Sequence, residues 1–200
     1  MNRIIMHWTA GTHTPGADDL VHYHFVIDGA GRVRPGLHYP EANSRIDHPG
    51  DTSTYAAHTL HANTGAIGVA VAAMVGARER PFYAGTYPVT KEQVAALAAH
   101  VAGLCLRYGI PVLRETVLTH AEVQPTLGIL QRGKWDITWL PGDTAPSDPV
   151  FVGDKLRHMI SAEVARQKRA TPVQKVVAVP KNELGWLALE WIKALFGGKK

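Results

Sequence analysis

AIGVAVAA, at residues 66–73, is a continuous run of small and branched apolar residues. A run of this length without polar alternation is typical of a strand that is covered on both faces. We therefore expect residues 66–73 to form the middle strand of a sheet, with the rest of the domain built around it.

Other segments rich in β-branched and aromatic residues predict further strands. They lie at residues 3–8, 21–27, 32–34 and 112–119. DGAG at residues 28–31 predicts the turn of a hairpin between the second and third of these strands, and Pro35 stops the pairing.

Two amphipathic helices are expected to cover the sheet. Thr90 and Gln93 form a capping box, and apolar residues then recur at helical spacing until Gly109 ends the helix. Asp148 and Pro149 predict the start of a second helix that runs to about residue 168. Between the strands, residues 36–65 carry four histidines and show little periodicity, which predicts a long ordered loop with a function.

The chain has 200 residues, of which 46% are hydrophobic, enough for one sizeable core. We expect a domain at residues 1–168, a linker at 169–181 and a C-terminal helix at 182–200. The only cysteine, Cys105, excludes an intramolecular disulfide and indicates a reducing compartment. The N-terminus lacks the pattern of a signal peptide, so we expect synthesis in the cytoplasm.

The net charge of +4 favours anionic partners only through diffuse attraction. We expect no nucleic acid partner, because the chain lacks a dense basic face with interleaved aromatic residues. Residues 183–196 are too short to span a bilayer, which needs about 20 apolar residues. With lysines on both sides, this segment predicts a helix that lies on an anionic membrane or packs against its own domain or another copy. The oligomeric state stays open.

His7 and His120 each end a predicted strand, and Asp136 follows Lys134 by two residues. A single histidine among eleven is more often structural than a ligand. However, two imidazoles and a carboxylate match the donors of a catalytic zinc site, which leaves a fourth position open for a water.

The sequence segments around these residues resemble those of one family. The matching segments are His7-Trp8-Thr9-Ala10-Gly11, Tyr23 to Asp28, His58 and Asn63 ahead of Ile67-Gly68-Val69, Thr119-His120-Ala121-Glu122, and Lys134-Trp135-Asp136. Over roughly residues 1–160 the series is similar to the zinc-dependent N-acetylmuramoyl-L-alanine amidases of type 2, which include phage endolysins and peptidoglycan recognition proteins. The resemblance implies an α/β fold with a central mixed β-sheet flanked by α-helices, here with a short C-terminal helical appendage.

The resemblance also implies roles for individual residues. His7, His120 and Asp136 would bind Zn2+, with Asp143 as the fallback for the third ligand, because the stretch after His120 is longer than in compact relatives. Lys134 would stabilise the oxyanion, and Tyr23 would orient a water or pass its proton. Because side chains alternate along a strand, we expect His24 to point away from the groove that Tyr23 lines.

Three further positions carry weaker expectations. His58 and Asn63 match positions beside the substrate, although they can also simply order their own loop. Glu122 can orient an imidazole or face solvent, and we leave it out of the catalytic set.

The implied activity is cleavage of the amide between N-acetylmuramic acid and the L-alanine of the peptidoglycan stem peptide. Ala70 stands where some members carry a glutamate, which favours a phage or prophage endolysin that acts at the cell wall or in the periplasm after release. The alternative is a non-catalytic peptidoglycan-binding module of the same fold. Filled ligand positions favour the enzyme.

Overall fold

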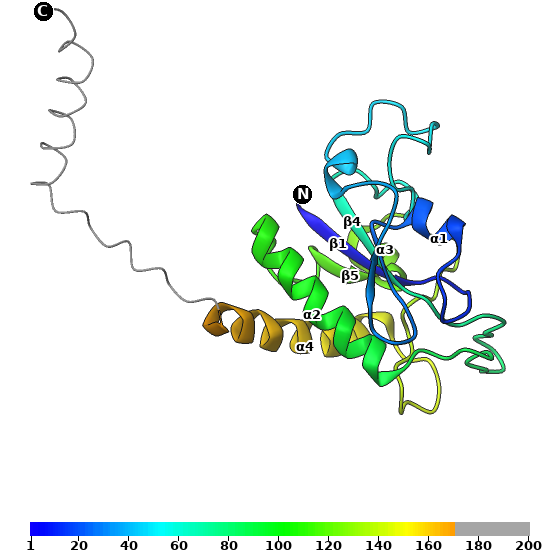
Figure 1. The fold of residues 1–200 in the computed structure, drawn as a ribbon. Coiled ribbons are helices and arrows are strands. Elements are labelled where there is room, and N and C mark those ends of the chain that lie inside the picture. The colour runs from blue at the N-terminus through cyan, green and yellow to red at the C-terminus, as the bar shows by residue number, and fades with distance from the viewer. Residues whose placement is uncertain (171–200) are drawn as a thin grey trace, which may run out of the picture. The chain divides into compact units, whose positions relative to one another are not determined.

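β4 (Ala66–Val71) is the middle strand of a five-stranded sheet with the order β3-β2-β4-β1-β5. All six of its residues are buried, and it pairs in parallel with β1 (Arg3–Trp8) and β2 (Phe25–Ile27). The computed structural model describes residues 1–170 (Figure 1). The prediction of a central strand is confirmed. Most of the predicted linker and the whole predicted C-terminal helix lie outside the described residues.

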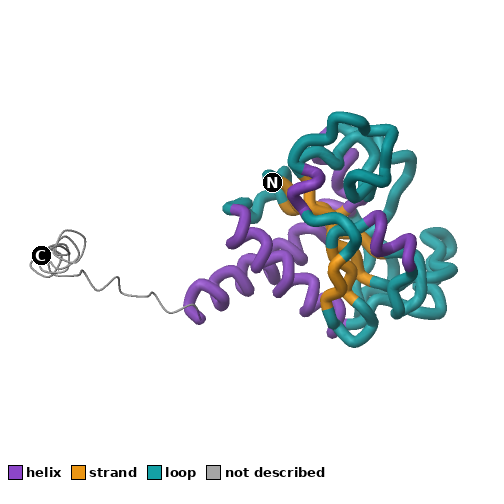
Figure 2. The backbone as a smooth tube through the Cα atoms, turned by 45° about the horizontal axis from the view of Figure 1, so that its top comes forward, coloured by secondary structure: helices purple, strands orange, loops and turns teal. Residues whose placement is uncertain are grey.

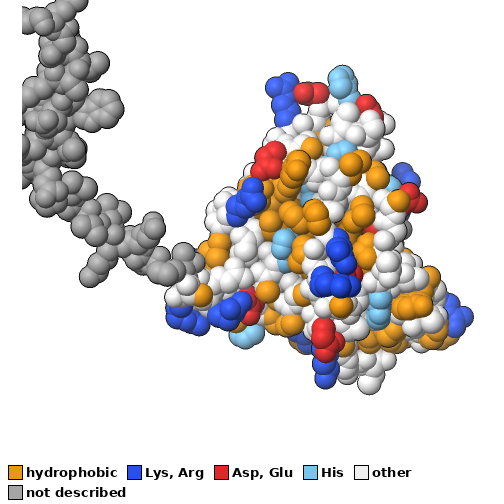
Figure 3. All heavy atoms as spheres, viewed as in Figure 1, with side chains coloured by type: hydrophobic (Ala, Val, Ile, Leu, Met, Phe, Trp, Pro, Cys, Tyr) orange, Lys and Arg blue, Asp and Glu red, His pale blue; other side chains and the backbone are white. Residues whose placement is uncertain are grey.

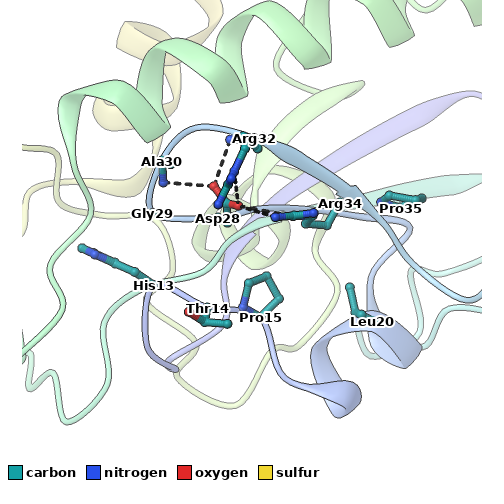
Figure 4. A pocket seen from close by; sticks show the side chains of 10 residues that line it. All are labelled: His13, Thr14, Pro15, Leu20, Asp28, Gly29, Ala30, Arg32, Arg34 and Pro35. Atoms are coloured by element: carbon teal, nitrogen blue, oxygen red, sulfur yellow. Dashed lines mark hydrogen bonds and ion pairs between the residues drawn. The ribbon is translucent and has the colours of Figure 1, made fainter.

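The sheet is mixed. β5 (Val117–Thr119) runs parallel to β1, whereas β3 (Val33–Pro35) runs antiparallel to β2 and forms the predicted hairpin. The Asp28 carboxylate holds the turn, because it accepts hydrogen bonds from the backbone N–H groups of Ala30 and Arg32 and pairs with the Arg32 and Arg34 guanidinium groups (Figure 4).

Two predicted strands are shorter than expected. Residues Ala17–His22 form the helix α1 rather than the start of β2, because the Asp19 carboxylate accepts a hydrogen bond from the Gly16 N–H and caps the first turn. Residues 112–116 form turns in which the Thr116 hydroxyl binds the carbonyls of Pro111 and Leu113. Local hydrogen bonding of polar side chains therefore outweighs β propensity in both places.

α2 (Lys91–Tyr108) and α4 (Pro149–Ala170) pack on one face of the sheet (Figures 1 and 2). α2 begins at the predicted capping box, in which Thr90 Oγ1 accepts from the Gln93 N–H and Gln93 Oε1 from the Thr90 N–H, each at 3.1 Å. It ends at Gly109, whose φ of 66° is left-handed. Neither these nor the other helices in residues 1–170 are long and apolar enough to cross a membrane.

The two faces of the sheet have different chemistry. Alternate residues of β1 and β4, such as Met6 and Val69, join the large apolar core with α2 and α4. The other face carries His7 beside two small positions of β4, Gly68 and Ala70. A Cβ atom on Gly68 would lie 2.5 Å from Cγ of His58, so only glycine leaves room for that ring. Small residues thus make space for polar side chains on this face.

Charged side chains do not gather into one patch on the face drawn in Figure 3. There the basic side chains of the described residues are scattered among hydrophobic and uncharged ones.

Candidate active site

Three donor atoms converge at one edge of the sheet. His7 lies near the end of β1, and His120 begins α3 (His120–Leu127) directly after β5, the parallel neighbour of β1. Asp136 follows in the next loop, where its carbonyl accepts a hydrogen bond from the Ala121 N–H and ties that loop to α3. Parallel pairing therefore brings the ends of two strands together, and one backbone contact adds the third residue.

The spacing of these donors fits a small cation. His7 Nδ1 lies 3.1 Å from His120 Nδ1, and each of these atoms lies 3.2 Å from Asp136 Oδ2. Donors at about 2.0–2.1 Å from a tetrahedral Zn2+ are about 3.3–3.4 Å apart. The cluster has the donor types and the separations of a zinc site.

The protonation states of the cluster also suit a metal. Burial, with help from the charges of His120 and Lys134, lowers the pKa of His7 to about 4, although Asp136 acts in the other direction. Burial would raise the pKa of Asp136, but its hydrogen bonds with His120 and His7 outweigh that effect and lower the pKa to about 2. At neutral pH the His7 imidazole is therefore neutral and the carboxylate is ionised, as metal ligands must be.

The cluster opens into a cavity with a volume of about 940 Å³. One wall is the loop at residues 46–64 and another is the segment 131–136. His120, Asp136, Tyr23, His58, Asn63 and Lys134 all line this cavity, whereas His7 is completely buried behind them. The fold brings all the predicted site residues to one place.

Tyr23 and His24 point to different surroundings, as expected, but not because of strand alternation. Tyr23 caps the end of α1, and its ring centroid lies 5.1 Å from that of His7. His24 is buried, with Nε2 3.1 Å from Asn43 Oδ1 and Nδ1 accepting a hydrogen bond from the Gly68 N–H. Burial, followed by the charges of Asp136 and Asp19, raises the pKa of Tyr23, so its phenol stays protonated.

The loop that carries His58 and Asn63 is ordered by its own polar side chains. Asn63 Oδ1 accepts hydrogen bonds from the backbone N–H groups of His58 and Thr59 at 3.1 and 2.8 Å. His58 Nδ1 lies 2.8 Å from the Thr59 hydroxyl, and its ring centroid lies 5.3 Å from that of His7. Both residues thus make the loop-ordering contacts that were the alternative to substrate binding.

Asp143 and Glu122 lie outside the cluster. Asp143 pairs with Lys155 at 3.2 Å and accepts a hydrogen bond from the Leu140 N–H, so it is not placed to replace Asp136. Glu122 is fully buried, accepts a hydrogen bond from the Thr119 N–H and pairs with Arg157 of α4 at 2.7 Å. Both expectations for Glu122 are wrong, because the start of α3 and the contact with α4 use its carboxylate.

Sequence analysis missed two residues that contact the candidate ligands. Gln131 Oε1 lies 2.9 Å from His120 Nε2, and Thr59 Oγ1 lies 3.4 Å from His7 Nε2. No local motif marks either residue, since both contacts depend on how the loops cross the site. The only available signal was the position of Gln131 between His120 and Asp136, and of Thr59 next to His58.

A second cavity, of about 600 Å³, lies beside the hairpin (Figure 4). Asp28, Arg32 and Arg34 line it, and both arginines pair with the Asp28 carboxylate. It contains none of the predicted site residues, so the larger cavity is the candidate active site.

Comparisons with known proteins give one sequence match. A family model described as N-acetylmuramoyl-L-alanine amidase matches residues 1–143. No curated protein sequence matches the chain.

Several solved structures are similar in fold. N-acetylmuramoyl-L-alanine amidase LysC from Clostridium intestinale URNW is 18% identical with a TM-score of 0.46, and the match covers 80% of this chain and 85% of LysC. The Ph2119 endolysin from a Thermus scotoductus bacteriophage is 17% identical with a TM-score of 0.40, over 66% of this chain and 80% of the endolysin. AmiD from E. coli, solved with a muropeptide substrate, is 18% identical with a TM-score of 0.41, over 60% of this chain and 48% of AmiD.

Proposed function

The chain belongs to the N-acetylmuramoyl-L-alanine amidase family, and we propose that it is a zinc-dependent peptidoglycan hydrolase. In this proposal it cleaves the amide between N-acetylmuramic acid and the L-alanine of the stem peptide. The observation that carries the proposal is the convergence of three donor atoms, 3.1 to 3.2 Å apart, at the bottom of a large cavity. A structural zinc site would need four protein ligands and no cavity.

His7 Nδ1, His120 Nδ1 and Asp136 Oδ2 are the atoms that would hold Zn2+. Zinc held there would supply the Lewis acid that activates a water for attack on an amide. A set of three protein ligands is typical of catalytic zinc sites, and two of these residues, His120 and Asp136, line the cavity.

Lys134 and Tyr23 supply the remaining chemistry in this proposal. Lys134 is exposed and lines the cavity, so its ammonium group can approach the carbonyl oxygen as negative charge develops there. Tyr23 is protonated and lies beside His7, so its hydroxyl can orient the attacking water or deliver a proton to the leaving nitrogen. Ala70, the β4 partner of His7, offers no carboxylate as a base.

The cavity suits a substrate of muropeptide size. Its volume of about 940 Å³ lies at the upper end of the usual range for ligand sites, roughly 300–1,000 Å³. The wall at residues 46–64 offers apolar side chains such as Ile46 and Tyr55 beside the polar His61 and Thr64. A peptide attached to a sugar presents the same mixture of apolar and polar groups.

Mass analysis of products from purified cell wall tests the activity. The full chain loaded with Zn2+ should release stem peptides with a free L-alanine amino group and leave the glycan strands intact. Metal analysis of the purified protein should find about one zinc per chain. Binding to the wall without peptide release would instead indicate the non-catalytic module, and cut glycan strands would contradict the proposed bond.

For the biological setting, we propose a phage or prophage endolysin made in the cytoplasm that reaches the wall or periplasm after release. Support comes from Tyr23 and Ala70, which resemble the phage-type members of the family. Expression inside a bacterium should cause lysis only after the inner membrane is permeabilised. Lysis without permeabilisation would contradict the setting, but not the activity.

A further inference from the structure

We propose that Gln131 and Thr59 are positioning residues that hold the imidazoles of His120 and His7 in the tautomer with hydrogen on Nε2. This tautomer presents the Nδ1 lone pairs to the metal. The inference rests on the proposed zinc site. It gives a role to the contacts of Gln131 with His120 and of Thr59 with His7, which the family resemblance does not explain.

The orientation of the Gln131 amide is set by its other contacts. Its Nε2 donates hydrogen bonds to the backbone carbonyls of Leu60 and Ile129, at 2.9 and 3.3 Å. Because carbonyl oxygens only accept, the amide nitrogen must face them, and Oε1 must face His120. Oε1 also only accepts, so the hydrogen in the 2.9 Å contact belongs to His120 Nε2. The lone pair of a neutral His120 is then on Nδ1, the atom that faces Asp136.

Thr59 gives His7 the same arrangement. The hydroxyl lies 2.8 Å from His58 Nδ1 and 3.4 Å from His7 Nε2. It has one hydrogen, which it can donate to only one of the two rings, and in our proposal it donates this hydrogen to His58 Nδ1. Its oxygen then accepts from His7 Nε2, which leaves the Nδ1 lone pair of His7 free. His58, which is buried and lines the cavity, acts through Thr59 in this arrangement.

One hydrogen bond links Gln131, which contacts His120, to the loop that carries Thr59, which contacts His7. Leu60, the residue after Thr59, accepts the hydrogen bond from Gln131 Nε2. The loop that supports His7 is therefore tied to the side chain that supports His120, and both are buried, with exposed fractions of 2% for Thr59 and 3% for Gln131. Buried groups of this kind commonly fix the ring orientation and tautomer of metal-binding histidines.

Paired variants of the full chain test the proposal. Gln131→Leu and Thr59→Val remove the acceptor, whereas Gln131→Glu and Thr59→Ser keep one. Gln124→Ala is the matched control, because its side chain accepts a hydrogen bond only from the backbone N–H of Gln131 among its described contacts. The readouts are the dissociation constant for Zn2+, measured by competition with a chelator, and the histidine tautomers in the metal-free protein, measured by nitrogen-15 NMR.

We expect Gln131→Leu and Thr59→Val to weaken zinc binding about 10- to 100-fold, the usual effect of losing such a partner. The NMR spectra should show a mixture of tautomers for His120 in the first variant and for His7 in the second. Thr59→Ser and Gln124→Ala should bind zinc within a few-fold of the original chain. Gln131→Glu keeps the acceptor but loses the donor to the Leu60 and Ile129 carbonyls, so it should lose less zinc affinity than Gln131→Leu.

Unchanged tautomers and zinc affinity in both acceptor-free variants would overturn the proposal. Equal weakening in the variants that keep an acceptor would also overturn it, since side-chain shape would then be the cause. If the Gln131 variants do not fold, the comparison of Thr59→Val with Thr59→Ser tests the proposal, because valine and serine both differ little in shape from threonine. Neither readout involves hydrolysis, so a chain that meets these expectations but releases no stem peptide contradicts only the proposed amidase activity.

Discussion

His7 Nδ1 and Asp136 Oδ2 lie 3.2 Å apart although 129 positions separate the two residues in the chain. Both are buried, and each lies on a different element, a central strand and the loop after α3. Burial of a carboxylate beside an imidazole is costly unless both groups have partners. At this contact the fold therefore buries two polar side chains, which belong to the proposed metal site, in place of apolar ones.

Asp136→Asn should reduce zinc binding by more than about 100-fold, since losing a ligand costs more than losing a supporting contact. Hydrolysis of cell wall should fall to background, and His120→Ala should behave in the same way. Metal analysis and the release of stem peptides measure the two effects. Asp143→Asn is the control, because Asp143 pairs with Lys155 away from the cluster. Loss of zinc in the Asp143 variant but not in the Asp136 variant would reverse the assignment of the third ligand.

Lys134→Ala should keep the zinc and lose rate. A cation that acts on the oxyanion contributes mainly in the transition state, so kcat should fall by about 10- to 1,000-fold with a smaller change in KM. Lys155→Ala, a change of a lysine that does not line the cavity, should leave kcat unchanged. Wild-type kcat in Lys134→Ala would remove the role given to this residue.

Glu122→Ala should destabilise the domain by about 3–5 kcal/mol, because it leaves the Arg157 guanidinium without its buried carboxylate partner and removes the cap of α3. Asp154 also pairs with Arg157 and would offset part of this loss. Asp47→Ala, which breaks an exposed pair with Arg45, should cost less than about 1 kcal/mol. Urea unfolding measures both variants, and equal effects would show that burial of the pair does not matter.

His24 should make the metal-free protein less stable in acid. Burial, with a smaller effect of the charge of His38, lowers its pKa from 6.5 to about 4, and the neutral ring accepts a hydrogen bond from the Gly68 N–H at Nδ1. Between these values the unfolded chain binds more protons than the folded one, so the free energy of unfolding falls as pH decreases from 6.5 towards 4.

The contribution of His24 to this loss is on the order of 3 kcal/mol. Urea unfolding of the chain and of His24→Gln at several pH values measures it. The variant should be less stable at neutral pH, yet its stability should depend less steeply on pH. An unchanged slope in the variant would show that His24 does not cause the acid sensitivity.

Deletion of residues 181–200 should separate the two interpretations of the C-terminal segment. Loss of binding to vesicles that contain anionic lipid, with an unchanged Tm, supports a helix that lies on the membrane. A lower Tm with no effect on vesicle binding supports packing against protein. Wall hydrolysis in solution should continue in either case, because residues 1–170 contain every proposed site residue.

The sequence by itself determined the features that depend on neighbours in the chain. The run at residues 66–73 could only be stable under two covering layers, and the capping box at Thr90 needed no more than one turn of helix to form. The sequence also predicted the chemical type of the site, since His7, His120 and Asp136 lie in short segments that resemble those of the family.

Only the tertiary structure decided which side chains support the site. Gln131 reaches His120 and Leu60 across 11 and 71 positions, and Glu122 pairs with Arg157 across 35. Tyr23 meets the His7 ring only because a short helix ends there rather than a strand. Such contacts depend on how loops and helices are packed in space, and no spacing along the chain encodes them. The sequence therefore specified the donors, while the packing of distant segments decided how each donor is held.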